Sequence, residues 1–183
     1  FRISTSYASL KMKVRTNKIM DEYLKDLGYN FWGKSIELTD GLSRIIKCQI
    51  LHDKDLFVLN SGGEFIPEIP IGNSIDKCKY EDSSNHFHID DYVAHKLNFN
   101  DLHFLGLGLE FMKQLTNRLK TDFPKKDFRI LLSFGKVEDT DVYEFGNCVT
   151  RFYSIREEAE KVFKISDLNS YKEEGIIEIE IKN

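Results

Sequence analysis

Apolar positions recur every three to four residues along residues 100–122, the longest regular pattern in the chain, at Phe104, Leu105, Phe111, Met112, Leu115 and Leu119. This spacing matches the roughly 3.6 residues per turn of an amphipathic α-helix. Pro124 follows and prevents the helix from continuing. Gly106 and Gly108 each cost about 1 kcal/mol relative to alanine inside a helix, so we expect another element to pack closely against them.

Shorter patterns predict the remaining elements. Apolar and polar residues alternate over 8–15 and 176–182, as in half-buried strands, and the almost wholly apolar run 128–134 predicts a strand covered on both faces. A second helix is expected over 17–27, capped by Thr16 or Asn17 and closed by Gly28. The other predicted strands are 44–51, 56–60 and 147–155, the first two forming a hairpin around residues 52–55.

These elements predict an α+β fold in a single domain, residues 1–183. We expect a mostly antiparallel sheet of about five to six strands with two main helices packed on one face. Residues 61–85 contain Pro67 and Pro70, two of the three prolines of the chain, and predict a long irregular loop. A chain of this size buries about 70% of its unfolded surface, enough for a substantial core.

Composition narrows the class of protein. A hydrophobic content of 41% and a charged content of 31% are typical of a soluble globular domain. No run of about 18 apolar residues predicts a membrane span. Cys48, Cys78 and Cys148 are odd in number and form no CxxC pair, which indicates free thiols in a reducing compartment. We therefore expect a cytoplasmic protein.

The net charge of −4 is unevenly distributed. Residues 1–34 carry seven basic and three acidic side chains, a balance of +4, so the rest of the chain sums to −8. This overall acidity makes nucleic acid an unexpected partner, because nucleic-acid binders normally present a basic surface. The basic face of the strand at 8–15, with Lys11, Lys13 and Arg15, leaves a nucleic-acid or anion surface as an open alternative.

The main candidate for a metal site is His86-Phe87-His88-Ile89-Asp90-Asp91. On an extended segment His86, His88 and Asp90 share one face, and their ligand types suit zinc or iron. The segment resembles the HxHxDH motif of metallo-β-lactamase-like hydrolases, with Asp91 in place of the last histidine. It is also similar to the HxD half of an iron-oxygenase facial triad. No histidine follows His103, so the later ligands of both families have no counterpart, and we predict no cofactor.

Other catalytic signatures are absent from the sequence, which has no GxxxxGK[ST] phosphate loop and no GxSxG elbow. Cys148 follows Gly146-Asn147 at a predicted strand start, where we expect a buried and inert thiol. We therefore expect a protein without enzymatic activity. The alternative is a metal-dependent enzyme or ligand-binding module that uses His86, His88 and Asp90.

Two features favour a protein partner. Residues 137–146 contain no basic residue and four acidic ones, Glu138, Asp139, Asp141 and Glu144. Phe31 and Trp32 belong to an aromatic cluster that either anchors an interface or closes the end of the core. We expect a non-enzymatic protein that binds another protein. One concrete form is a bacterial immunity or inhibitor protein, whose acidic side chains imitate a phosphate track and neutralise a basic toxin domain.

Overall fold

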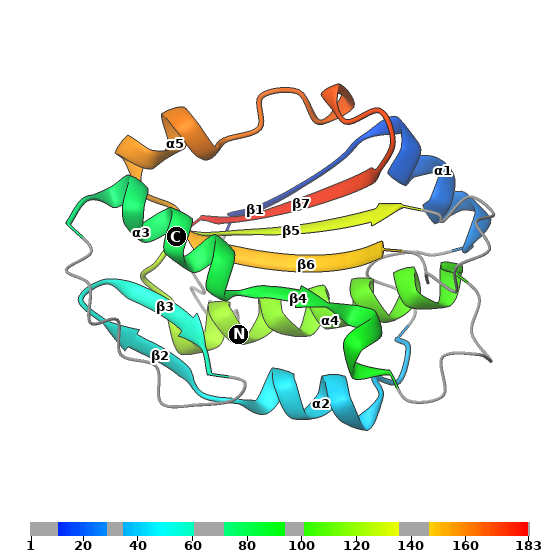
Figure 1. Cartoon of the computed structure of the whole chain (residues 1–183), viewed down its shortest axis with the longest axis horizontal. Coiled ribbons are helices and arrows are strands. Elements are labelled where there is room, and N and C mark those ends of the chain that lie inside the picture. Colours follow the sequence, from blue (N-terminus) through cyan, green and yellow to red (C-terminus); the bar gives the residue numbers. More distant parts are fainter. Residues whose placement is uncertain (1–10, 29–34, 61–71, 94–100, 136–146, 183) are drawn as a thin grey trace, which may run out of the picture.

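The structure is a computed structural model that describes residues 11–28, 35–60, 72–93, 101–135 and 147–182 (Figure 1). The strands are β1 (Lys11–Thr16), β2 (Ile50–Asp53), β3 (Leu56–Leu59), β4 (His86–His88), β5 (Phe128–Gly135), β6 (Asn147–Ser154) and β7 (Gly175–Lys182). The helices are α1 (Lys18–Asp26), α2 (Asp40–Lys47), α3 (Ser74–Ser84), α4 (Asp101–Asp122) and α5 (Glu157–Phe163), with short 3-10 helices η1 (Ile89–Tyr92) and η3 (Leu168–Ser170).

Five of these strands form one antiparallel sheet in the order β1-β7-β5-β6-β4, and β2 and β3 form a separate two-stranded sheet. The predicted single-domain α+β fold with an antiparallel sheet is confirmed. The last strand, β7, lies inside the sheet between β1 and β5 (Figure 1). The first described strand therefore depends on the last one for its pairing.

Helix α4 packs on one face of the sheet, and its apolar residues form the main core with the inward side chains of β5, β6 and β7. An ideal Cβ on Gly108 would lie 2.6 Å from the sulfur of Cys148 and 2.8 Å from Cδ1 of Leu132. One on Gly106 would lie 2.7 Å from Cδ1 of Ile36. The predicted close approach at both glycines is confirmed.

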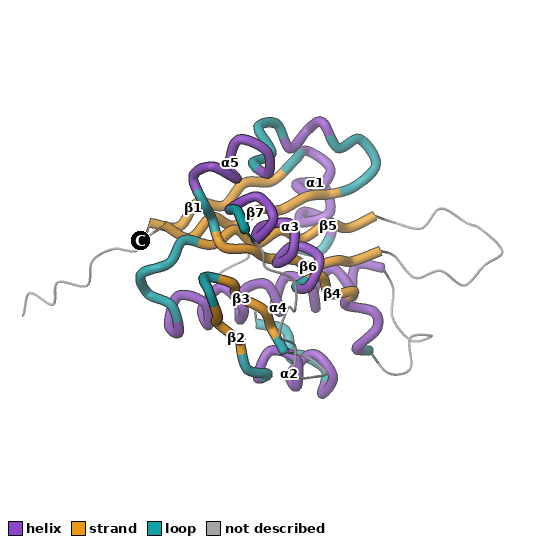
Figure 2. Tube along the Cα trace, turned by 60° about the vertical axis from the view of Figure 1, so that its left-hand side comes forward, coloured by secondary structure: helices purple, strands orange, loops and turns teal. Residues whose placement is uncertain are grey.

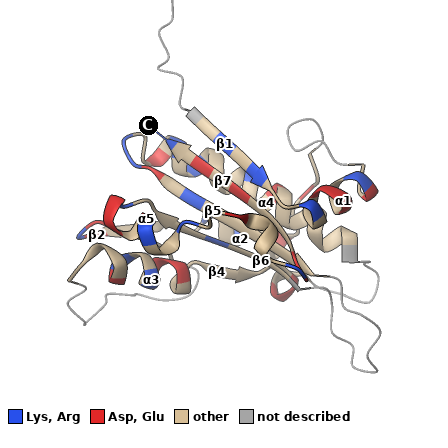
Figure 3. Ribbon diagram, turned by 90° about the horizontal axis from the view of Figure 1, so that it is seen from above, with Lys and Arg blue, Asp and Glu red and all other residues tan. Residues whose placement is uncertain are grey.

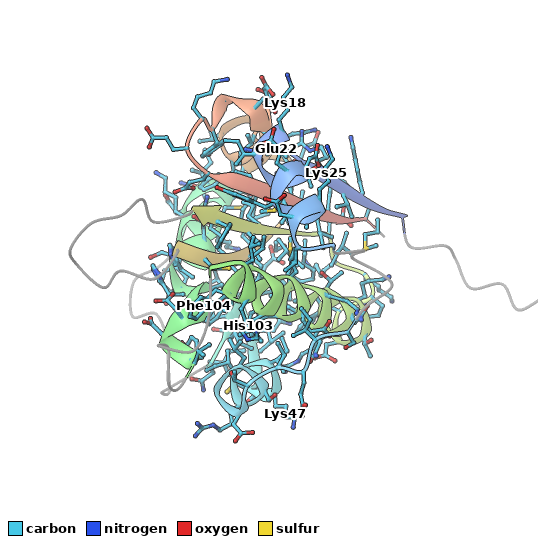
Figure 4. The ribbon with its side chains drawn as sticks, turned by 90° about the vertical axis from the view of Figure 1, so that its right-hand side faces the viewer. Lys18, Glu22, Lys25, Lys47, His103 and Phe104 are labelled. Carbon is cyan, nitrogen blue, oxygen red and sulfur yellow. The ribbon has the colours of Figure 1, made fainter. Side chains whose placement is uncertain are left out.

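Helix α1 joins the same core through Met20, which is fully buried. Its N-cap is Asn17, one of the two predicted candidates. The Asn17 Oδ1 accepts hydrogen bonds from the backbone N–H of Met20 and of Ile176, so the cap also ties the helix to β7. On the outer surface, Lys18, Glu22 and Lys25 project into solvent (Figure 4).

The opposite face of the sheet is also covered, which the sequence did not predict (Figure 2). Helices α3 and α5 and the turn η3 pack there around a smaller apolar cluster: Cys78, Leu131, Tyr153, Ala159, Leu168 and Ile176. The sheet is therefore a central layer, and β5 is buried on both sides as predicted.

Two sequence predictions were wrong. Residues 44–51 were expected to form a strand, but α2 occupies the first half of this segment and β2 begins only at Ile50. Thr39 caps α2 through its hydroxyl oxygen, which accepts from the N–H of Leu42. The helical set Leu42, Ile45 and Ile46 is buried. Ile46, Cys48 and Ile50 alternate as in a strand, although Ile46 lies in α2 and Ile50 begins β2.

The predicted loop at 61–85 was too long, because Ser74–Ser84 forms α3. Asn73 caps this helix by accepting from the N–H of Asp76. Residues 61–71 lie outside the described residues. In the part of the chain that the structure describes, no helix combines the length and the apolar character needed to cross a membrane.

Candidate functional site

The predicted protein-binding residues lie outside the described part of the chain. Glu138, Asp139, Asp141 and Glu144 fall in the connection between β5 and β6, and Phe31 and Trp32 fall between α1 and α2. The flanking residues Gly135 and Asn147 are paired with each other at the end of the β5–β6 ladder.

The predicted metal ligands are described, and the structure brings only two of them together. His86 and His88 are exposed on β4, the edge strand, with ring centroids 5.0 Å apart and ring planes 23° apart. The extended conformation ends at His88, so the alternation that would place Asp90 beside them stops there. Burial raises the pKa of Cys148 in the main core, and the negative charge of Asp90 raises it further.

Among the described residues, no group of three or more His, Cys, Asp or Glu side chains, the set His86, His88 and Asp90 included, is placed to hold a metal ion. Arg151 lies opposite His86 in the strand register, and its guanidinium is 3.5 Å from the carboxylate of Asp82. Burial lowers the pKa of His86, and the charges of His88 and Arg151 act in the same direction. This group is a polar surface patch on β4 and its neighbours.

A second group of polar side chains is buried and was not predicted. Glu81 on α3 is fully buried, and each of its carboxylate oxygens accepts a backbone hydrogen bond. Oε1 accepts from the N–H of Phe57 at 2.9 Å, and Oε2 accepts from the N–H of Ser154 at 2.8 Å. Arg156 donates to the same two oxygens at 2.7 Å and 2.9 Å. Burial raises the pKa of Glu81, while these donors act in the opposite direction.

Asn85, one helical turn after Glu81, completes this arrangement. Its Oδ1 accepts from the N–H of Leu59 at 2.9 Å, and its Nδ2 donates to the carbonyls of Phe57 at 2.8 Å and Phe152 at 3.2 Å. Glu81 of α3 and its C-cap residue Asn85 therefore satisfy backbone groups of both β3 and β6. Buried backbone groups need hydrogen-bond partners, and between the two sheets these side chains supply the partners that another strand would otherwise provide.

Arg156 also holds the hairpin turn between β2 and β3. Lys54 and Asp55 have φ values of 48° and 65°, so both adopt the left-handed conformation of a two-residue hairpin turn. Arg156 donates to the backbone carbonyl of Asp55 and, at 3.3 Å, to its carboxylate, which also pairs with Lys126. Burial works to raise the pKa of Asp55, but the two cations outweigh it and hold this pKa below its ordinary value.

A further buried arginine joins α5 to the sheet. Arg129 on β5 is fully buried and donates to both carboxylate oxygens of Glu160 on α5, at 2.6 Å and 2.8 Å. It also donates to Glu180 at 3.1 Å, and its Nε lies 3.3 Å from Glu178 in an ion pair without a hydrogen bond. Arg15 on β1 binds the other oxygen of Glu178 at 2.9 Å. Acidic segments of β7 thus lie beside basic segments of β1 (Figure 3).

The buried charges of the described residues are therefore structural. Each of the five charged side chains that the described part buries forms at least one ion pair: Glu81, Glu110, Arg129, Arg156 and Glu178. Cys148 is fully buried, and burial raises its pKa, which disfavours a nucleophilic thiolate. From the sequence alone, charged residues are predicted to be exposed. Their ion-pair partners are too distant in the sequence to form a recognisable pattern.

A model of the family described as Uncharacterized protein PM0498 matches residues 15–183. The chain belongs to this family. The match to the PM0498 family includes every buried ion pair described above, from Arg15 to Glu180. No curated protein and no solved structure matches the chain.

Proposed function

We propose that this member of the PM0498 family acts by binding another protein and carries out no reaction of its own. The observation that supports the proposal is the use of the buried charged groups. Glu81, Arg129 and Arg156 each hold an element of the fold in place, and their hydrogen-bonding capacity is directed at the protein itself. Exposed side chains are then the ones that remain for function.

The proposed partner is basic. The net charge is −4, and opposite charge accelerates association and helps to select a partner. The proposed contact surface is the one predicted from the sequence, with acidic groups at Glu138, Asp139, Asp141 and Glu144 and aromatic anchors at Phe31 and Trp32. A bacterial immunity protein that covers a basic toxin domain is the concrete form that we favour.

The test compares two variants that remove the same charge from different surfaces. The first, E138Q/D139N/D141N/E144Q, neutralises the proposed surface. The second, E22Q/D26N/E37Q/D53N, neutralises two glutamates and two aspartates that are exposed on other elements. Each variant takes the formal net charge from −4 to 0, so bulk charge is the same in both.

Tagged wild-type protein is used to capture partners from the native host, and a stoichiometric partner is then titrated against the three proteins at two salt concentrations. We expect a basic partner, at least tenfold weaker binding for the first variant, and little change for the second, since desolvated charges at an interface each contribute about 1 kcal/mol or more. Equal loss in both variants, or an acidic partner, would count against the proposed surface.

A further inference from the structure

The outer edge of β1 is the feature of the described fold that invites a partner. β1 ends the five-stranded sheet, and among the described residues only β7 pairs with it (Figure 3). Alternate backbone N–H and C=O groups of an edge strand point away from the sheet and can pair with an added strand. Val14, on the core side of β1, is 39% exposed although Met12 on the same side packs against the core.

A second copy of β1 fits this edge poorly. In an antiparallel pair, directly opposite residues share a face of the sheet. In the symmetric registers that pair most of the strand, Lys13 would lie opposite Lys13 or Arg15 of the other copy. Like charges in that position are destabilising. The edge therefore disfavours self-association and selects for a different sequence.

The inner edge of β1 shows which sequence fits. There β7 alternates isoleucine with glutamate, and the register places Lys13 opposite Glu180, Val14 opposite Ile179 and Arg15 opposite Glu178. The side chains of a strand stand roughly perpendicular to the sheet, so they can contact neighbours on either side. The guanidinium of Arg15 is occupied by Glu178 and by the carbonyl of Ile165 at 2.7 Å. Among the described side chains on this face of β1, Lys13 is the exposed cation, and it can lie beside an added strand.

We propose that the outer edge of β1 binds an extended segment of a second protein in which acidic and apolar residues alternate. The backbone of the segment pairs with β1, an acidic residue lies opposite Lys13, and an apolar residue covers Val14. This surface consists of different residues from the acidic surface proposed above and takes a ligand of opposite charge.

The test uses the full chain and two labelled peptides. The first copies residues 175–182, GIIEIEIK, and the second, GIIKIKIK, replaces both glutamates by lysine. Binding is measured by fluorescence anisotropy to wild type, K13E and K13Q. We expect wild type to bind the acidic peptide at least fivefold more tightly than the basic one, since a cross-strand charge pair contributes up to roughly 1 kcal/mol. K13E should reverse this preference, and K13Q should abolish it. If K13E fails to fold, K13Q alone decides the charge dependence.

Hydrogen exchange locates the peptide. Slower exchange of the amides at 11–16, with β7 unchanged, supports addition at the outer edge. Faster exchange in β7 would mean that the peptide replaces β7, and this result overturns the proposal. Equal affinity for both peptides would also overturn the proposal. So would unchanged binding of peptides whose alternate amides are N-methylated, or a stable dimer of the chain alone in sedimentation.

Discussion

Replacing Glu81 by glutamine is the sharpest test of the buried network. The two side chains have nearly the same shape, but both oxygens of the carboxylate accept a backbone N–H, from Phe57 at 2.9 Å and from Ser154 at 2.8 Å. An amide has one oxygen, so its NH2 group must face one of these donors. The substitution also leaves the guanidinium of Arg156, only 9% exposed as a residue, with Asp55 as its remaining carboxylate partner.

Breaking one partner of a buried ion pair costs about 3–5 kcal/mol, and an unsatisfied buried donor costs about 1–3 kcal/mol. These terms overlap, so we expect E81Q to lower the free energy of unfolding by about 4 kcal/mol. This is a large part of the roughly 5–15 kcal/mol that is typical of a folded domain. For a chain of this length the corresponding fall in Tm is about 8–16 °C.

The assay is equilibrium urea unfolding at pH 7, followed by far-ultraviolet circular dichroism. E37Q is the control, because Glu37 is exposed and surface substitutions usually change stability by less than about 0.5 kcal/mol. The double variant E81Q/R156M removes both charges, so it should lose less than the sum of the single losses. A change of less than about 1 kcal/mol in E81Q, or strict additivity in the double variant, would refute this account of the network.

Three further results are expected. G108A should lose about 1–3 kcal/mol because its new methyl meets the sulfur of Cys148, whereas G106A, facing the end of a flexible side chain, should lose less; thermal unfolding of both variants checks this. In the native protein a thiol reagent should modify Cys48 fastest, since the other two thiols are buried, and denaturant should make all three react. Burial works to raise the pKa of Glu180, but the guanidinium of Arg129 holds this pKa below its ordinary 4.5. The ion pair therefore stabilises the fold above pH 4.5, and this contribution is lost as the pH falls through the pKa of Glu180 in the folded protein. Urea unfolding from pH 6 down to about pH 3.5 should therefore show a smaller loss of stability in E180Q than in wild type.

The elements that were predictable share one property, which is a strong apolar period of sufficient length. α4 and β5 are both of this kind, and the glycines of α4 even indicated the close approach of other elements. α3 was missed because its buried residues are Cys78 and Glu81, so its packing is largely polar. Hydrophobic periodicity cannot detect a helix that is held by a carboxylate and an amide.

The candidate site was less predictable than the fold. His86 and His88 were correctly placed on one face, but the expectation for Asp90 assumed an extended segment that in fact ends at His88. The ion pair between Glu81 and Arg156 joins residues 75 positions apart. Neither residue belongs to a motif, and a charged residue without a motif is normally assigned to the surface.

The inner position of β7 has a consequence for synthesis. A nascent chain exposes β1 to the cell while more than 150 further residues are translated, because β7, its only described strand partner, begins that far along the chain. Such distant pairings form slowly because a long segment must close first. A premature stop before residue 175 would remove an inner strand and not an edge strand, so β1 would lose its pairing to the rest of the sheet.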